Sequence, residues 1–128
     1  PFPTFYYATC PRLTGAISTL ESSGLMAQMN ERLQNDPILA GDYLAAHVDY
    51  EAARSALAKQ ENLVVPEIEG VTAGGMPDRV KCLHSLVAHS LAAGEGVNPL
   101  GDEALSVLDN WWVSRPCNVI SNLLDEEE

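Results

Sequence analysis

Apolar side chains recur every three or four residues along most of this chain, which is the spacing of one face of an α-helix. Residues that cap or open helices precede these periodic runs, and glycine follows several of them. The pattern predicts five helices, at about 11–23, 25–33, 37–59, 79–93 and 103–112. The first of them is expected to be capped by Thr9 or Cys10, with Pro11 at its first position.

The first nine residues follow a different pattern. Phe5, Tyr6 and Tyr7 are β-prone, and prolines stand at positions 1 and 3. This composition predicts one extended strand, at a sheet edge or as half of a hairpin whose partner precedes Pro1. The expected fold is therefore mainly α (α+β), a compact bundle of about five helices with an N-terminal β-strand or hairpin element.

Helical periodicity is lost between residues 60 and 78, where prolines and glycines predict a long loop. Loops of this length are usually functional or disordered. Residues 113–128 are expected to form an irregular tail with an acidic end. The length of 128 residues fits a single domain over 1–128. Because the chain begins at Pro1, it is expected to lack an upstream N-terminal segment.

The chain has 18 acidic and 7 basic residues, a formal net charge of −11. This balance argues against nucleic acid as a partner, because phosphates require a basic surface. The sequence has no apolar run of the roughly 18 residues that span a membrane, and no secretory leader. Three sparse cysteines favour a reducing compartment. These features predict a cytoplasmic protein whose acidic surface meets protein partners.

The segment 79–93 carries the most reactive side chains of the chain, namely Cys82, His84 and His89. On a regular helix Cys82 and His89 share a face, but seven residues of rise separate them by roughly 10 Å. Cys82 and His84 converge on one metal ion only if the helix start is irregular. Cys10 stands at another predicted helix start. The candidate metal ligands are therefore Cys10, Cys82, His84 and His89, with zinc as the possible ion.

Two other interpretations of these side chains stay open. They are equally compatible with packed residues, each buried separately and satisfied by one hydrogen bond. Alternatively, a thiol at a helix N-terminus favours a thiolate, so Cys82 is a candidate nucleophile with His84 or His89 as its base.

Two further features bear on function. The Gly74–Gly75 turn with Asp78, Arg79, Lys81 and Asn98 is a candidate site for an anion, or else a structural cap and turn. The adjacent Trp111–Trp112 pair closes the core or forms a homodimer contact.

Four segments together resemble one protein family. They are Phe2-Pro3-Thr4-x-Tyr6-Tyr7-x-Thr9-x-Pro11, Gly24-Leu25-Met26, Gly74-Gly75-Met76-Pro77-Asp78-Arg79-Val80-Lys81-Cys82-Leu83-His84 and Gly96-Val97-Asn98-Pro99-x-Gly101-Asp102. They resemble the uncharacterised domain of unknown function 501 family, found mainly in high-GC Gram-positive bacteria, up to about residue 109.

The resemblance implies no established activity. It does imply an upstream segment with a cysteine-containing turn, which this chain lacks. The usual gene neighbourhood of the family implies a cytoplasmic accessory or regulatory role linked to cell division or phosphate metabolism.

Overall fold

The computed structural model describes residues 2–108 and is mainly helical. Its helices are α1 (Pro11–Glu21), α2 (Leu25–Asn35), α3 (Pro37–Gln60), α4 (Leu83–Ala93) and α5 (Pro99–Val107), with a short 3₁₀ helix η1 (Pro66–Ile68). The prediction of about five helices is confirmed, and α1, α2 and α3 each begin at the predicted residue. The predicted extension of the last helix to Trp112 and the predicted tail 113–128 lie outside the described residues.

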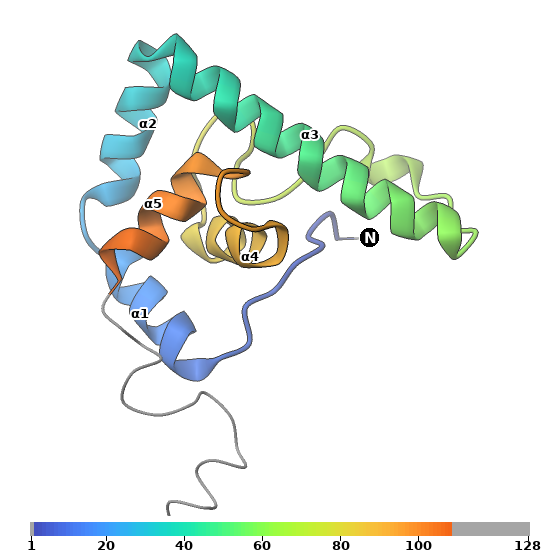
Figure 1. Cartoon of the computed structure of the whole chain (residues 1–128), viewed down its shortest axis with the longest axis horizontal. Helices are drawn as coiled ribbons and strands as arrows, with labels where there is room; N and C mark the ends of the chain where they lie inside the picture. The colour runs from blue at the N-terminus through green and yellow to red at the C-terminus, as the bar shows by residue number, and fades with distance from the viewer. Residues whose placement is uncertain (1, 109–128) are drawn as a thin grey trace, which may run out of the picture.

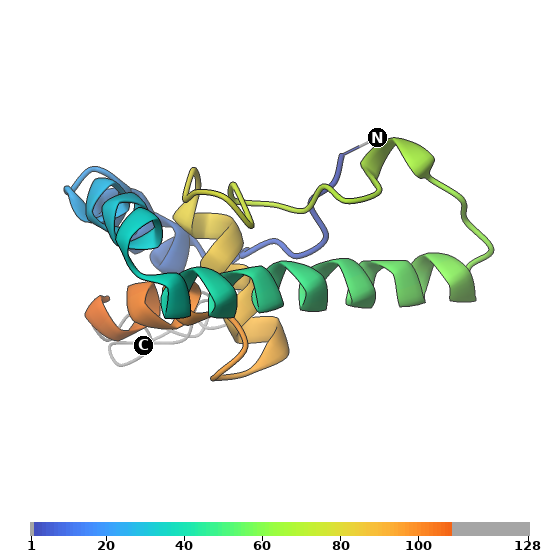
Figure 2. The ribbon, with the colours of Figure 1, turned by 90° about the horizontal axis from the view of Figure 1, so that it is seen from above.

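The helices pack around α4, which lies at the centre of the molecule (Figure 1). Helix α4 packs against α1 and α5, and the long α3, which runs above α4 in this view, contacts α2 and α5. Figure 2 shows that the second half of α3 reaches beyond the other helices, with the loop that follows it running back alongside. Three apolar side chains of α4, those of Leu83, Leu86 and Val87, are completely buried. None of the helices described is long and apolar enough to cross a membrane.

The predicted N-terminal β element is wrong for residues 2–108, which contain no strand. Residues 2–10 instead form an extended segment whose main chain bonds to side chains of α3. The backbone N–H groups of Phe5 and Tyr6 both donate to Tyr50 Oη, and the Arg54 guanidinium donates to the Pro3 carbonyl. Because these side chains satisfy the backbone, the segment needs no partner strand.

Helix α4 begins at Leu83, four residues later than predicted, and Asp78 does not cap it. Val80 exchanges two hydrogen bonds with the Asn30 side chain: its N–H donates to Oδ1 at 2.7 Å, and its carbonyl accepts from Nδ2 at 3.0 Å. The Lys81 N–H donates to a carbonyl of the glycine turn. Since these main-chain groups already have partners, no helical turn forms before Leu83.

Tyr43 fixes the same loop from the side of α3. Its hydroxyl donates to the Arg79 carbonyl at 2.9 Å. Burial raises the pKa of Tyr43 well above its usual range, so the hydroxyl remains a donor at neutral pH.

Helix α5 begins at Pro99 and is capped by Asn98, whose Oδ1 accepts from the Gly101 N–H at 3.0 Å. Asp102, which directly precedes the predicted helix 103–112, does not cap the helix but accepts from the Gly96 N–H at 2.8 Å. A Cβ at Gly101 would lie 2.2 Å from the Leu86 carbonyl oxygen. Glycine therefore permits the close approach of α4 and α5.

Gly75→Ala is expected to destabilise the protein by at least about 2 kcal/mol. Gly75 has a φ of +94°, and an added Cβ would lie 2.5 Å from the Arg79 carbonyl oxygen. Gly41→Ala is the matched control, because Gly41 lies inside α3 with nothing within 4 Å of an added Cβ. This control is expected to gain about 0.5–1 kcal/mol. Urea unfolding measures both, and equal stabilities would contradict the assigned turn.

Candidate metal centre

The side chains of Glu21, Cys82 and His84 meet where α1 ends and α4 begins. One oxygen, one sulfur and one ring nitrogen, taken one from each residue, all lie within 4.8 Å of one another. We call these three residues the Glu–Cys–His cluster. All three are half-buried, so the cluster is open to a small ligand from solvent.

Glu21 is the last residue of α1 and connects it to α4. Its Oε2 accepts from the Leu83 N–H at 2.8 Å, and its Oε1 lies 3.1 Å from His84 Nδ1. Cys82 precedes α4 but makes no side-chain capping bond. The carboxylate therefore supplies the cap from another helix, at a helix end that favours negative charge.

The His84 ring is oriented by groups of α1. Its Nε2 lies 3.2 Å from the Thr14 carbonyl oxygen and 3.3 Å from Ser18 Oγ. Because a carbonyl oxygen only accepts, Nε2 carries a hydrogen. Nδ1 is then the nitrogen that faces Glu21, either as a lone pair for a metal ion or, when protonated, as a donor to the carboxylate.

Cys82 is a free cysteine in an extended conformation just before α4. The Ser85 hydroxyl donates a weak hydrogen bond to Sγ at 3.7 Å. Ligand atoms of a tetrahedral zinc ion are about 3.3–3.8 Å apart, given bonds of about 2.0–2.3 Å. The three ligand atoms, which lie within 4.8 Å of one another, would therefore come about 1 Å closer together on binding such an ion. Three protein ligands leave the fourth position of such an ion open.

The structure separates the two other predicted ligands from this cluster. Cys10 caps the opposite end of α1 from Glu21, and the 11 residues of that helix place the two roughly 16 Å apart. Cys10 is also disulfide-bonded, whereas a metal requires a thiolate.

His89 lies further along α4 and is completely buried. Its Nε2 lies 2.9 Å from Asp49 Oδ2, and its Nδ1 lies 3.1 Å from Asn98 Nδ2. The Asn98 oxygen already accepts from Gly101, so the amide nitrogen is the donor to Nδ1. His89 therefore donates from Nε2 to Asp49, and neither of its nitrogens is left for a metal.

The aromatic rings of Tyr6 and Tyr50 cover this buried network. Tyr6 stacks on His89 at a ring distance of 6.0 Å, and Tyr50 meets it edge-on at 5.1 Å. In the structure His89 thus joins α4 to α3, α5 and the N-terminal segment. Asn98, predicted as part of an anion site, also belongs to this network and does not line the cavity bordered by Asp78, Arg79 and Lys81.

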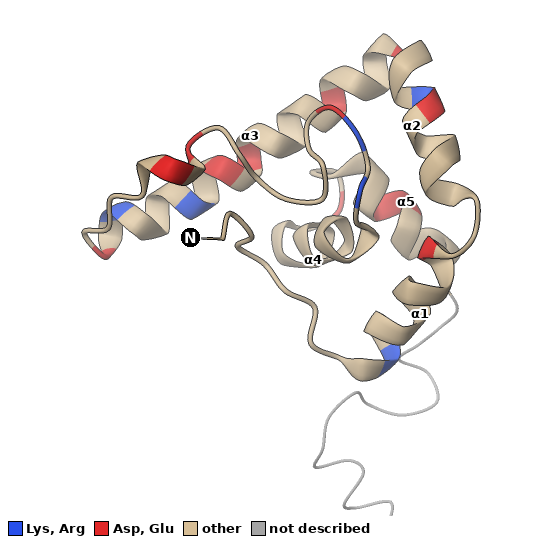
Figure 3. Cartoon of the chain, turned by 180° about the vertical axis from the view of Figure 1, so that it is seen from behind, with Lys and Arg blue, Asp and Glu red and all other residues tan. Residues whose placement is uncertain are grey.

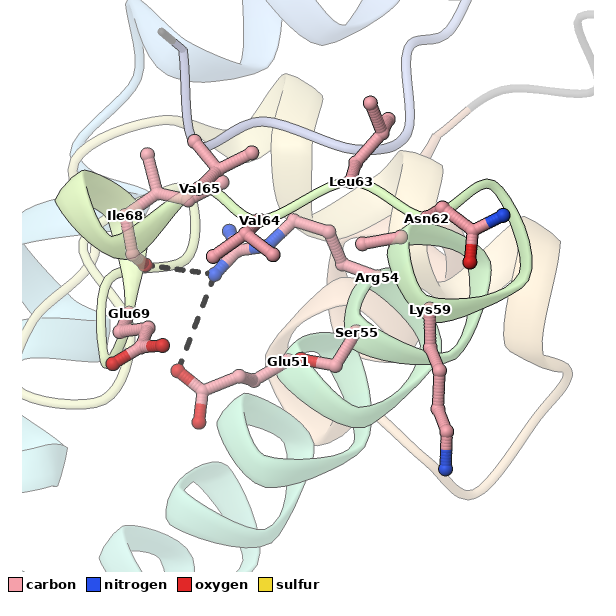
Figure 4. A pocket seen from close by; sticks show the side chains of 11 residues that line it. Glu51, Arg54, Ser55, Lys59, Asn62, Leu63, Val64, Val65, Ile68 and Glu69 are labelled. Carbon is pink, nitrogen blue, oxygen red and sulfur yellow. Dashed lines mark hydrogen bonds and ion pairs between the residues drawn. The ribbon is translucent and has the colours of Figure 1, made fainter.

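The sequence patterns did not single out Arg54, which lines a cavity at the end of α3. This cavity has a volume of about 680 Å³ and lies between the end of α3 and residues 62–69. Figure 4 shows the Arg54 guanidinium pointing into it, bonded to the Ile68 carbonyl and close to Glu51. Since Arg54 also bonds to the carbonyl of Pro3, it holds the N-terminal segment and the loop against α3. The sequence does hint at this role, because Arg54 follows Tyr50 by four residues and both therefore lie on the buried face of α3.

Comparison with known proteins tests the family resemblance. A family model described as "Protein of unknown function (DUF501)" matches residues 1–106. Neither the comparison with curated proteins nor that with solved structures finds a match. The family match covers most of the chain, and it confirms the resemblance noted in the four sequence segments. The chain therefore belongs to the DUF501 family of proteins of unknown function.

Proposed function

We propose that this chain is a zinc-binding regulatory domain, in which Glu21, Cys82 and His84 hold one ion. The observation that supports this most directly is the convergence of a carboxylate, a thiol and an imidazole within 4.8 Å. The three residues come from two helices that are distant in sequence. Thiolate, imidazole and carboxylate together form a ligand set used for zinc.

The groups around the cluster support the same function. Histidine ligands usually donate their second ring N–H to a carbonyl or carboxylate, and His84 Nε2 faces the Thr14 carbonyl in this way. The Leu83 N–H holds the second oxygen of Glu21. The side chains of two of the three ligands are thus already oriented, so less conformational entropy is lost when an ion binds.

Binding of an ion here is expected to regulate the protein by joining α1 to the start of α4. A metal that binds only the folded chain adds its binding free energy to stability. The open fourth position is suited to a water molecule or to a side chain from a protein partner.

The alternative, an enzyme with Cys82 as nucleophile, has less support. A nucleophilic thiol needs a base within hydrogen-bond reach. The His84 nitrogens bond to Glu21, Thr14 and Ser18, and Cys82 Sγ accepts a weak hydrogen bond from the Ser85 hydroxyl.

The experiment that tests the zinc proposal is a titration of the metal-free chain with Co²⁺, followed by competition with Zn²⁺. We expect one ion per chain and a sulfur-to-cobalt charge-transfer band in the near ultraviolet. Cys82→Ser is expected to abolish the band, whereas the double variant Cys10→Ser/Cys117→Ser, which removes the two other sulfurs of the chain, is expected to keep it. A wild-type chain without the band, or a band that survives in Cys82→Ser, would refute the proposal.

A further inference from the structure

A second site lies in the loop that precedes α4, apart from the Glu–Cys–His cluster. An open cavity of about 420 Å³ is lined by Pro3, Thr4 and the loop residues 71–76, 78, 79 and 81. None of the three cluster residues lines it. Figure 3 shows that this loop carries basic residues, as the blue stretches leading toward α4.

Two cations in the cavity wall have no counter-charge. Arg79 and Lys81 are exposed, and neither makes an ion pair within 4.0 Å among residues 2–108. Asp78 also lines the cavity but pairs with neither. By contrast, Arg32 and Arg54 each have a carboxylate within 4.0 Å. In a chain of net charge −11, two unpaired cations facing one cavity leave a local site for negative charge.

The backbone of the loop offers further donors. The N–H groups of Ala73, Gly74 and Gly75 have no acceptor within the described part of the chain. Both glycines have positive φ, +68° and +94°. Successive N–H groups in turns of this type form concave sites for anions.

The loop is also held in place before any ligand arrives. Thr72 Oγ1 hydrogen-bonds to His47 Nδ1 at 2.8 Å, Val80 bonds to Asn30, and Tyr43 bonds to the Arg79 carbonyl. These contacts anchor both ends of the lining segment to α2 and α3. A rigid set of donors binds with a smaller loss of conformational entropy than a flexible one.

We infer that this loop binds the phosphate group of a small molecule. The Arg79 guanidinium matches two phosphate oxygens, the Lys81 ammonium adds a second charge, and the amides of the glycine turn face a third oxygen. A volume of about 420 Å³ lies within the range of small-molecule pockets, about 300–1,000 Å³. The remainder of the ligand lies along the wall formed by Val71, Met76 and Pro3.

Inorganic phosphate is the probe that tests this inference, in a calorimetric titration of the metal-free chain at constant ionic strength. We expect saturable binding with one site per chain. Lys81→Gln is expected to weaken it about tenfold, the loss of one charge-assisted hydrogen bond, and Arg79→Gln at least as much, because the guanidinium holds two oxygens. Asp78→Asn is expected to tighten it, since it removes a negative charge from the wall.

Lys59→Gln is the matched control, because it removes one exposed cation at the other cavity. It is expected to change phosphate affinity less than twofold. Equal weakening by Lys59→Gln and Lys81→Gln, or no saturation by the wild-type chain, would overturn the inference. Phosphate binding is expected to persist in His84→Ala, so failure here is distinguishable from failure of the zinc proposal.

Discussion

His89→Leu is expected to lower the free energy of unfolding by about 3 kcal/mol. His89 is completely buried and bridges Asp49 and Asn98. Leucine fills much of the volume but removes both hydrogen bonds. Water can replace the bond to Asp49, whose side chain is 47% exposed, but not the bond to Asn98, which is completely buried. The Asn98 amide keeps only a weak contact with Met76 Sδ at 3.6 Å.

His84→Leu provides the matched control, because it is the same substitution in the same helix at a position where the side chain is 32% exposed. Its partly exposed ion pair is worth at most about 1 kcal/mol. Urea unfolding of both variants, without metal, measures the difference. Equal losses would contradict the role assigned to His89. A double-mutant cycle with Asn98→Ala is expected to give a coupling of about 1 kcal/mol or more between the two residues.

Most of the helices were predictable because local chemistry determines them. Pro11 and Pro37 open α1 and α3, and the Asp36 side chain caps α3 by accepting from the N–H groups of Ile38 and Leu39. These effects depend on neighbours in sequence, so a pattern of residues reveals them. The N-terminal segment was also predictable as extended, but its partners were not, because the side chains of Tyr50 and Arg54 in α3 replace the expected strand.

The start of α4 was not predictable for the opposite reason. Asp78 followed by Arg79 has the composition of a helix N-terminus, and local propensity favours a helix there. In the structure, the Val80 backbone instead forms two hydrogen bonds with the side chain of Asn30, 50 residues earlier in the chain. Long-range hydrogen bonds of this kind override a local preference of a few tenths of a kcal/mol.

The late start of α4 at Leu83 also explains which residues of the candidate metal site could be predicted from the sequence. Convergence of Cys82 and His84 was expected only if the helix did not begin regularly, and the helix begins just after Cys82. Pairing of Cys82 with His89 assumed a helix running from Arg79. Glu21 was missed because it lies 61 residues before Cys82, and no spacing within one segment indicates a contact between two helices. The Glu21 carboxylate could be assigned to the site only from the packing of α1 against α4.

Glu21 is both a proposed zinc ligand and the hydrogen-bond acceptor for the Leu83 N–H at the start of α4. Two substitutions separate these roles. Glu21→Gln keeps an oxygen that can accept from the Leu83 N–H but loses the charge, whereas Glu21→Ala loses both. We expect each variant to bind zinc more than about a hundredfold more weakly, a larger loss than that of an outer partner of a ligand. In the metal-free state Glu21→Ala is expected to lose about 1–2 kcal/mol of stability, and Glu21→Gln about half of that.

Zinc competition and urea unfolding measure the two effects separately. Glu31→Gln is the control for net charge, because Glu31 is exposed on α2, and it is expected to change neither quantity. Wild-type zinc affinity in Glu21→Gln would exclude the carboxylate as a ligand, even if Cys82 and His84 bind the ion. Unchanged metal-free stability in Glu21→Ala would show that the bond to Leu83 does not stabilise α4. Glu21→Gln keeps the oxygen that accepts from the Leu83 N–H, whereas Glu21→Ala does not. Glu21→Gln is therefore expected to lose the zinc ion and still keep α1 joined to α4.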